Sequence, residues 1–187
     1  MSKKALLISG WIAIVYAVVD VPRLTLYWFA DNFMGTSGAQ AAQGFISLSG
    51  LLLWLFLFIR LRQLLNNQFG FHQVDAEART LIWMSVALTG LNLFEIATRP
   101  ISTLLLIISI TAVIVVSVVG TVFAIKLLRL PHQLYGLLRP YCYTLMVANL
   151  SYATLFLLPL GILFGIANSI ILGMIFFRSA ELIRPGC

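Results

Sequence analysis

Long apolar stretches that each end in a cation constrain the fold of this chain more than any other feature. The stretches that end at Arg60, Lys126 and Arg178 are long enough to cross a bilayer, since one crossing needs about 20 apolar residues. Hydrophobic residues make up 61% of the 187 residues and charged residues only 10%, which leaves too little polar surface to cover a water-soluble globule. Because the apolar runs are continuous rather than alternating, they favour helices over a membrane barrel. The sequence therefore predicts an all-α, polytopic integral membrane protein.

The apolar stretches predict six transmembrane helices, arranged as three helical hairpins. Four of the helices are expected at residues 5–27, 42–65, 78–97 and 101–128. The segment 141–183 is too long for one crossing and suits two helices, with a tight turn at the Pro-Leu-Gly sequence of residues 159–161. The segment 31–43, rich in Gly, Ala and Gln, is expected to be a flexible outer loop. Six crossings use nearly the whole chain, so residues 1–187 are expected to form a single domain.

The distribution of Lys and Arg predicts the orientation in the membrane. With the N-terminus in the cytoplasm, ten of the twelve Lys and Arg residues are cytoplasmic, and only Arg23 and Arg99 lie on the outer side. This bias follows the positive-inside rule and predicts that both termini are cytoplasmic. We expect the membrane to be a bacterial cytoplasmic membrane. Contacts with lipid headgroups then explain the net charge of +6, so no nucleic-acid partner is expected.

Five of these cations are expected to form a cytoplasmic interface with the lipid bilayer or with a partner protein, namely Arg60, Arg62, Lys126, Arg129 and Arg178. In three places a leucine follows the cation by four residues, at Leu64, Leu130 and Leu182. Residues 69–70 and 135–136 also match, since each is an aromatic residue followed by glycine. Two interpretations stay open: the hairpins arose by duplication, or the likeness reflects the shared composition of membrane helices.

Two acid–base pairs at the outer helix ends form the candidate polar site. Asp20 and Arg23 are three residues apart, and Glu95 and Arg99 are four apart, so each pair lies on one face of its helix. Charges at membrane depth are costly and therefore mark functional sites. The pairs predict a site for an ion, a headgroup or a polar solute. The alternative is that they are local ion pairs which anchor the helix ends at the outer interface.

Asparagines and small residues within the apolar stretches predict contacts between helices. Asn92, Asn149 and Asn168 are expected to hydrogen-bond across helices, which contributes about 1 kcal/mol each. Ala13 and Ala17 form a small-xxx-small pattern, which allows close helix approach either within one molecule or in a dimer.

The sequence contains no pattern for catalysis, metal binding or a cofactor. Both histidines, His72 and His132, fall in segments predicted to be cytoplasmic, so a haem held by two histidines within the membrane is not expected. The acidic residues near His72 lack a cysteine partner, so no metal site is expected. No phosphate-binding loop, nucleophile elbow or metalloprotease sequence occurs. We therefore expect no cofactor, and an enzyme is disfavoured.

Two functions remain. The first is a non-enzymatic small subunit, scaffold or oligomerising module of a membrane complex, because the stretch 101–119 is almost entirely Leu, Ile and Val. The second is a component that binds or transports a small solute or a lipid at a polar site in the outer half of the bundle. Six helices in 187 residues is similar in size to the substrate-binding subunits of energy-coupling-factor transporters, and Ala13 and Ala17 resemble a pattern on their first helix. That resemblance implies a solute site.

Overall fold

The chain folds almost entirely into helices. The computed structural model describes residues 2–33, 36–98, 103–130, 134–154 and 156–182, with the backbone alone for 20–33, 36, 98 and 106. The described helices are α1 (Lys3–Phe33), α2 (Thr36–Phe69), α3 (Asp75–Thr98), α4 (Thr103–Leu127), the short 3-10 helix η1 (Leu134–Gly136), α5 (Leu138–Ala153) and α6 (Leu158–Leu182). No strand occurs in these residues. The prediction of an all-α fold is confirmed.

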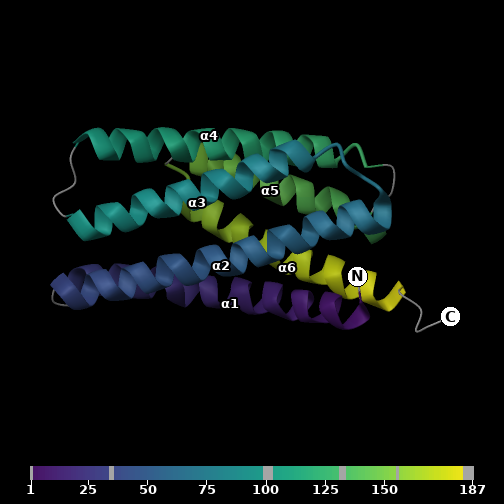
Figure 1. Ribbon diagram of the computed structural model, residues 1–187, viewed down its shortest axis with the longest axis horizontal. Coiled ribbons are helices and arrows are strands. Elements are labelled where there is room, and N and C mark those ends of the chain that lie inside the picture. Colours follow the sequence, from purple (N-terminus) through teal and green to yellow (C-terminus); the bar gives the residue numbers. More distant parts are fainter. Residues whose placement is uncertain (1, 34–35, 99–102, 131–133, 155, 183–187) are drawn as a thin grey trace.

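The helices form a ring. Each long helix packs against the next one along the chain, and α6 packs against α1, which closes the ring. Helix α1 begins and α6 ends at the same end of the bundle, on the right in Figure 1. The cations Arg60 and Lys126 lie near this end, because α2 and α4 both finish there. We call it the basic end, and the opposite one the far end.

Four of the described helices are long and apolar enough to cross a membrane. They are Ser37–Phe69, Asp75–Ala97, Thr103–Leu127 and Leu158–Leu182. Large apolar side chains on the outside of the bundle are exposed, such as Phe45 at 76% and Trp83 at 73%, as expected of surfaces that contact lipid. The chain therefore has the properties of a multi-pass membrane protein. Helix α5 has 16 residues and is about 24 Å long, shorter than the roughly 30 Å hydrocarbon layer.

Two predicted loops differ from the structure. The expected outer loop 31–43 is wrong, because α1 continues to Phe33 and α2 begins at Thr36. The Ala and Gln residues of this segment have high helix propensity, and they extend the helices instead of separating them. The turn between α5 and α6 comes before residues 159–161, since α6 already begins at Leu158. Pro159 is tolerated in the first helical turn, where its missing N–H has no intrahelical partner to lose.

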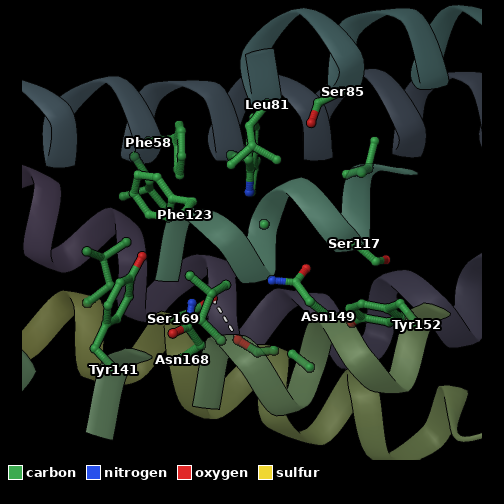
Figure 2. Close-up of a pocket in the computed structure, with 18 of the residues that line it drawn as sticks. Phe58, Leu81, Ser85, Ser117, Phe123, Tyr141, Asn149, Tyr152, Asn168 and Ser169 are labelled. Atoms are coloured by element: carbon green, nitrogen blue, oxygen red, sulfur yellow. Dashed lines mark hydrogen bonds between the residues drawn. The ribbon is translucent and has the colours of Figure 1, made fainter. Parts of the chain in front are cut away.

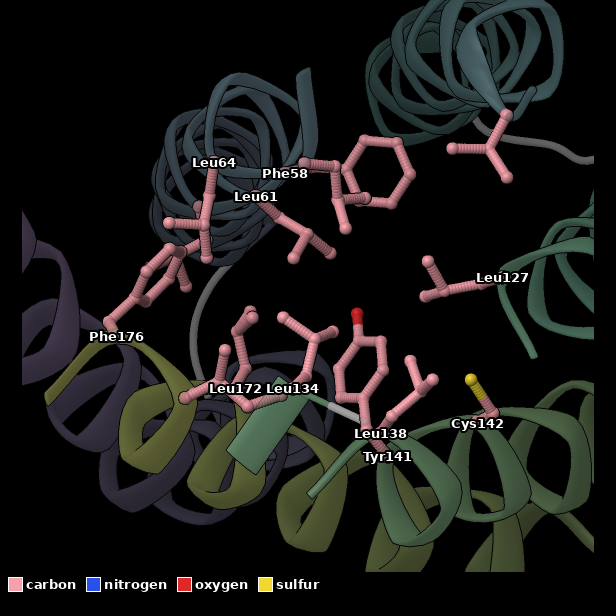
Figure 3. Packing of buried hydrophobic residues seen from close by; sticks show 14 of the residues in the cluster. Phe58, Leu61, Leu64, Leu127, Leu134, Leu138, Tyr141, Cys142, Leu172 and Phe176 are labelled. Atoms are coloured by element: carbon pink, nitrogen blue, oxygen red, sulfur yellow. The ribbon is translucent and has the colours of Figure 1, made fainter. Parts of the chain in front are cut away.

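The apolar core lies at the basic end. Leu61, Leu64, Leu127, Leu134 and Phe176 are each at most 1% exposed, and Figure 3 shows them converging from α2, α4, η1 and α6. The core explains part of the repeated leucine pattern, because both Leu64 and Leu130 are buried. Leu182 departs from that pattern, since it is 62% exposed. The residues of the core fill the ring at this end and leave no wide path through it.

Small residues bring α1 and α6 into close contact where the ring closes. A Cβ atom added at Gly173 would lie 3.2 Å from the carbonyl oxygen of Gly10, and one added at Gly10 would lie 2.7 Å from the Phe177 ring. Ala13 and Ala17 are 0% and 2% exposed. The small-xxx-small pattern of α1 is therefore used inside the bundle.

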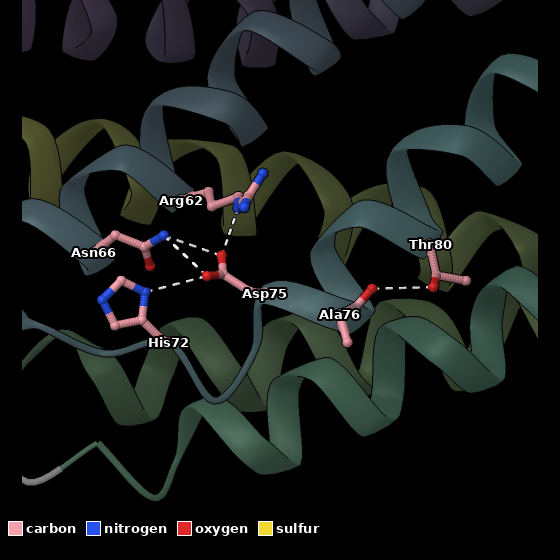
Figure 4. Close-up of polar contacts among 6 residues, drawn as sticks. All are labelled: Arg62, Asn66, His72, Asp75, Ala76 and Thr80. Atoms are coloured by element: carbon pink, nitrogen blue, oxygen red, sulfur yellow. Dashed lines mark hydrogen bonds and ion pairs between the residues drawn. The ribbon is translucent and has the colours of Figure 1, made fainter.

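Polar contacts hold the α2–α3 connection, and link α3 to α4, at the basic end. Asp75 accepts hydrogen bonds from Arg62 at 2.5 Å and from Asn66 at 3.0 Å, and His72 lies 3.2 Å from it (Figure 4). Lys126 of α4 forms an ion pair with Glu77 of α3. The Asp75 contacts therefore join the first and second hairpins where the chain reverses direction, and the Lys126–Glu77 pair joins the two helices of the second hairpin.

The two matched aromatic-glycine pairs meet at this end. Gly70 and Gly136 have positive φ angles of 60° and 83°, which glycine adopts without steric cost. The rings of Phe69 and Tyr135 lie 6.4 Å apart in an edge-to-face arrangement. The two corresponding glycines thus both adopt a positive φ angle, and the two corresponding aromatic residues contact each other. The same contacts are expected whether the hairpins arose by duplication or share only the composition of membrane helices.

Candidate functional site

A cavity of about 310 Å³ lies at the centre of the ring and is lined by all of the long helices. Each helix contributes a side chain with a polar group to its wall (Figure 2). In chain order from α1 to α6 these are Tyr16, Trp54, Ser85, Ser117, Asn149 and Asn168. Apolar side chains fill the spaces between them, so the wall combines a few hydrogen-bonding groups with a mostly apolar surface. This is the usual composition of a site for a small organic molecule.

A second cavity of about 790 Å³ adjoins the first. The two share the lining residues Tyr16, Trp54, Ser85 and Leu88. Its other lining residues come mainly from α2 and α3 toward the far end, together with Leu158 at the start of α6. Since these residues lie on the far-end side of the shared ones, the second cavity extends from the central cavity toward the far end.

Aromatic and aliphatic side chains close the central cavity toward the basic end. Phe58, Leu81, Phe123 and Tyr141 line the cavity and also belong to the buried core. The rings of Trp54 and Phe58 are stacked with centroids 4.8 Å apart, and those of Phe58 and Phe123 are 5.2 Å apart. Among the described residues, the cavity is therefore a pocket whose floor is packed against the apolar core.

Some polar groups that line the two cavities form hydrogen bonds within the protein, and others do not. Asn168 accepts a hydrogen bond from Thr144 at 3.2 Å, and Ser169 donates one to the carbonyl oxygen of Gly165 at 3.0 Å. In the larger cavity, Ser47 donates to Asn92 at 3.1 Å. The Nδ2 atom of Asn149 is buried and has no hydrogen-bond partner among the described residues. This amide nitrogen is therefore enclosed between α5 and Gly120 of α4.

The described lining residues of both cavities carry no charge. Burying an ion without a counter-charge is strongly unfavourable. The site therefore suits an uncharged ligand and disfavours an ion or a phosphorylated compound.

The predicted polar site lies largely outside the described part of the structure. The side chains of Asp20 and Arg23 are among those given as backbone alone, and Arg99 lies outside the described residues. Glu95 accepts a hydrogen bond from Ser109, which links α3 to α4. It lines neither cavity. The structure thus gives Glu95 a local partner and does not bring it to the central cavity.

The predicted asparagines separate into two kinds. Asn92 and Asn168 bond to side chains of neighbouring helices, Ser47 of α2 and Thr144 of α5. Asn149 instead packs against the backbone of α4 at Gly120, where an added Cβ would lie 2.6 Å from its Nδ2 atom. All three line a cavity, which their sequence positions alone did not indicate.

The predicted cytoplasmic cations lie at the basic end with several different contacts. Arg62 and Lys126 pair with Asp75 and Glu77. The guanidinium of Arg60 lies 5.2 Å from the Phe56 ring centroid and donates to Gln63. Arg129 and Arg178 are exposed. The exposed cations are thus free to meet lipid headgroups, while the paired ones join helices.

Sequence reasoning missed several residues of the cavity, among them Tyr16, Trp54, Ser85 and Ser117. The stretch 101–119 was interpreted as almost entirely Leu, Ile and Val, yet its Ser117 lines the cavity, and so does Gly120 just after it. These two interrupt the run of Val and Ile three residues apart, which places them on one helix face. That interruption was the available signal.

No protein-family model, no curated protein and no solved structure matches this chain. The function is therefore argued from the cavity.

Proposed function

We propose that this protein is a membrane-embedded binding component for a small, uncharged, amphiphilic molecule. The observation that carries the proposal is the central cavity, which is lined by every long helix and has a polar group from each. A volume of about 310 Å³ lies at the lower end of the range for ligand pockets. Since a water molecule occupies about 30 Å³ of liquid, this space suits a ligand, or a ligand portion, of roughly ten to fifteen non-hydrogen atoms.

The aromatic wall supports an amphiphilic ligand. The lining residues Tyr16, Trp54, Tyr141 and Tyr152 each have an aromatic ring together with a polar atom. Aromatic residues bury large apolar areas and keep a hydrogen-bonding group at one edge. A molecule with a flat or unsaturated apolar part and one or two uncharged polar groups would use both features.

The proposal includes a membrane topology. All six helices cross a bacterial cytoplasmic membrane as three hairpins, with both termini in the cytoplasm. The support is the concentration of Lys and Arg near the basic end, which follows the positive-inside rule. In this orientation the packed floor of the cavity faces the cytoplasm, and the larger cavity leads from the outer half of the membrane to the central one. The site would therefore receive its ligand from the outer leaflet or from outside the cell.

The test is binding of acetylnaphthalene, an uncharged aromatic ketone of suitable size, to the protein in lipid nanodiscs. We expect saturable binding with one molecule per protein, measured by quenching of tryptophan fluorescence after correction for partition into empty nanodiscs. Ala148 lines the cavity and is 3% exposed, so Ala148→Phe should fill the site and abolish saturation. Leu150 lies on the same helix and is 57% exposed, so Leu150→Phe is the matched control. Non-saturable uptake that is equal in both variants would contradict the proposal.

The hypothesis of a small subunit or scaffold within a membrane complex stays a prediction. The small-residue face that could have served self-association, at Ala13 and Ala17, is buried inside the bundle. A central pocket also has no role in a scaffold. For these reasons the cavity supports binding better than assembly as the primary function.

A further inference from the structure

Two serine hydroxyls at the central cavity lack a hydrogen-bond partner in the described part of the chain. A serine or threonine hydroxyl in a helix commonly donates to the backbone carbonyl oxygen four residues earlier. The hydroxyls of Thr111, Thr121 and Ser169 do so here, at distances of 2.8 to 3.0 Å. The hydroxyls of Ser85 on α3 and Ser117 on α4 form no hydrogen bond among the described residues. Their hydrogen-bonding capacity is therefore open to another molecule.

Both serine hydroxyls can be reached from the cavity. Ser85 lines the central and the larger cavity, and Ser117 lines the central one. Among the described residues, the unpartnered polar atoms that the protein encloses completely are Oδ1 of Asn66, Oε2 of Glu77 and Nδ2 of Asn149. Neither serine oxygen belongs to this set. A polar group at a cavity wall is able to bind water or a ligand, which an enclosed group is not.

The two serines lie on the far-end side of the pocket. Figure 2 shows Ser85 and Ser117 on one side of the cavity and Phe58 and Phe123 on the other. Both phenylalanines belong to the apolar core at the basic end, whereas Ser85 also borders the larger cavity, which extends toward the far end. The pocket is thus apolar at its floor and hydrogen-bonding where it joins the larger cavity.

We propose that Ser85 and Ser117 donate hydrogen bonds to an uncharged oxygen of the ligand, such as a ketone or hydroxyl oxygen, while the apolar part of the ligand lies against the aromatic floor. This inference rests on the proposed function, and it specifies the polar group of the ligand and its orientation. Each serine hydroxyl has one O–H donor, and an uncharged oxygen has lone pairs that accept it. Any part of the ligand beyond this oxygen would extend into the larger cavity.

The first test compares two probes that differ in one oxygen. Acetylnaphthalene carries a ketone, and ethylnaphthalene has the same ring system and nearly the same shape without it. For the wild-type protein in nanodiscs we expect acetylnaphthalene to bind about five- to tenfold more tightly after correction for partition. Ser85→Ala and Ser117→Ala should each reduce this preference, and the double variant should bind both probes with equal affinity. Alanine removes only the hydroxyl and has a high helix propensity, so the variants should fold.

Matched controls remove hydroxyls that already bond within the protein. Thr80 on α3 and Thr111 on α4 are exposed, line neither cavity and donate to the backbone of their own helices. Thr80→Val and Thr111→Val should therefore keep the full ketone preference. A preference that persists in the double serine variant, or that falls equally in the threonine controls, would overturn the role of the serines. Failure of acetylnaphthalene to saturate the wild-type protein would instead overturn the proposed function itself.

The second test concerns the orientation and uses two isomers of equal composition. Pentanoylnaphthalene extends the chain beyond the ketone, whereas acetylnaphthalene with a propyl group on the other ring extends the apolar part. In the proposed orientation the pentanoyl chain enters the larger cavity of about 790 Å³, and the propyl group meets the packed floor. We expect the pentanoyl isomer to bind wild type about tenfold more tightly, because the other isomer overpacks the floor. Equal or reversed affinities would overturn the orientation.

Discussion

The contact that closes the helical ring provides the sharpest test of the architecture. Substitution of Gly173 places a side chain between α6 and α1. A Cβ atom there would lie 3.0 Å from Cδ1 and 3.1 Å from Cγ1 of Ile14, and 3.2 Å from the carbonyl oxygen of Gly10. Carbon atoms prefer separations of about 3.5 to 4.0 Å. The Ile14 side chain can rotate, but the Gly10 carbonyl belongs to the backbone of α1, so the two helices must separate.

The size of the effect follows from this crowding. Overpacking a tight contact costs about 1 to 3 kcal/mol. We expect Gly173→Ala to destabilise the protein by about 1 to 2 kcal/mol, since one methyl group is partly accommodated by Ile14. Gly173→Leu should cost about 3 kcal/mol or more, because the longer side chain has no space beside the α1 backbone. The higher helix propensity of Ala and Leu does not offset the cost, since both helices remain helical in the membrane after they separate.

The assay uses a thiol that the fold itself protects. Cys142 on α5 is 0% exposed, and Cys187 is the second cysteine of the chain. In a Cys187→Ser background, a thiol-reactive dye reports unfolding through Cys142 as the detergent sodium dodecyl sulfate is titrated into mixed micelles. Gly90→Leu is the matched control, because nothing lies within 4 Å of a Cβ added at Gly90. If Gly173→Leu unfolds at the same detergent fraction as Gly90→Leu, then α1 and α6 do not approach as closely as described and the ring is not closed there.

Three other predictions concern the polar contacts of the basic end and the orientation of the bundle. Lys126→Met leaves Glu77, which is 14% exposed, without its cation; we expect a loss of about 1 to 2 kcal/mol in the same detergent titration, less than for a fully buried pair because Lys126 is 39% exposed. Glu77→Gln added to this variant should restore part of the loss, and no recovery would argue against pairing. Asp75→Ala removes the acceptor shared by Arg62 and Asn66, so limited proteolysis should cleave the α2–α3 connection faster than in wild type, whereas unchanged cleavage would show that the contact does not hold it. In intact cells, a membrane-impermeant maleimide should label Gly38→Cys but not Gln73→Cys, and the reverse pattern would contradict the proposed orientation.

Some features of the fold could be read from hydropathy because they depend on local composition. The apolar stretches that end at Arg60, Lys126 and Arg178 correspond to α2, α4 and α6. Helix ends were less predictable. The segment 37–43 was expected to be a loop because it is short of large apolar residues, yet it continues α2. Its Ala and Gln residues favour helix whether or not a membrane surrounds them.

The candidate site could not be predicted in the same way. The charged pairs were selected because charge at membrane depth is costly, but Glu95 has a local partner in Ser109. The polar residues of the cavity wall are mostly Ser, Tyr and Trp, residue types whose presence in a membrane helix does not by itself indicate a site. What distinguishes them is that they face one space, and this depends on how each helix is rotated about its axis.

The sequence by itself determined that this is a helical membrane protein with a positively charged end, because solvation of apolar and charged groups acts on each segment separately. Only the tertiary structure decided that the helices close into a ring, that the core fills one end of it, and that a pocket remains at the centre. Ring closure depends on contacts between distant residues such as Gly10 and Gly173. Asn149 shows the difference most clearly: the sequence predicted a hydrogen bond across helices, and the arrangement of α4 and α5 instead packs its amide against Gly120.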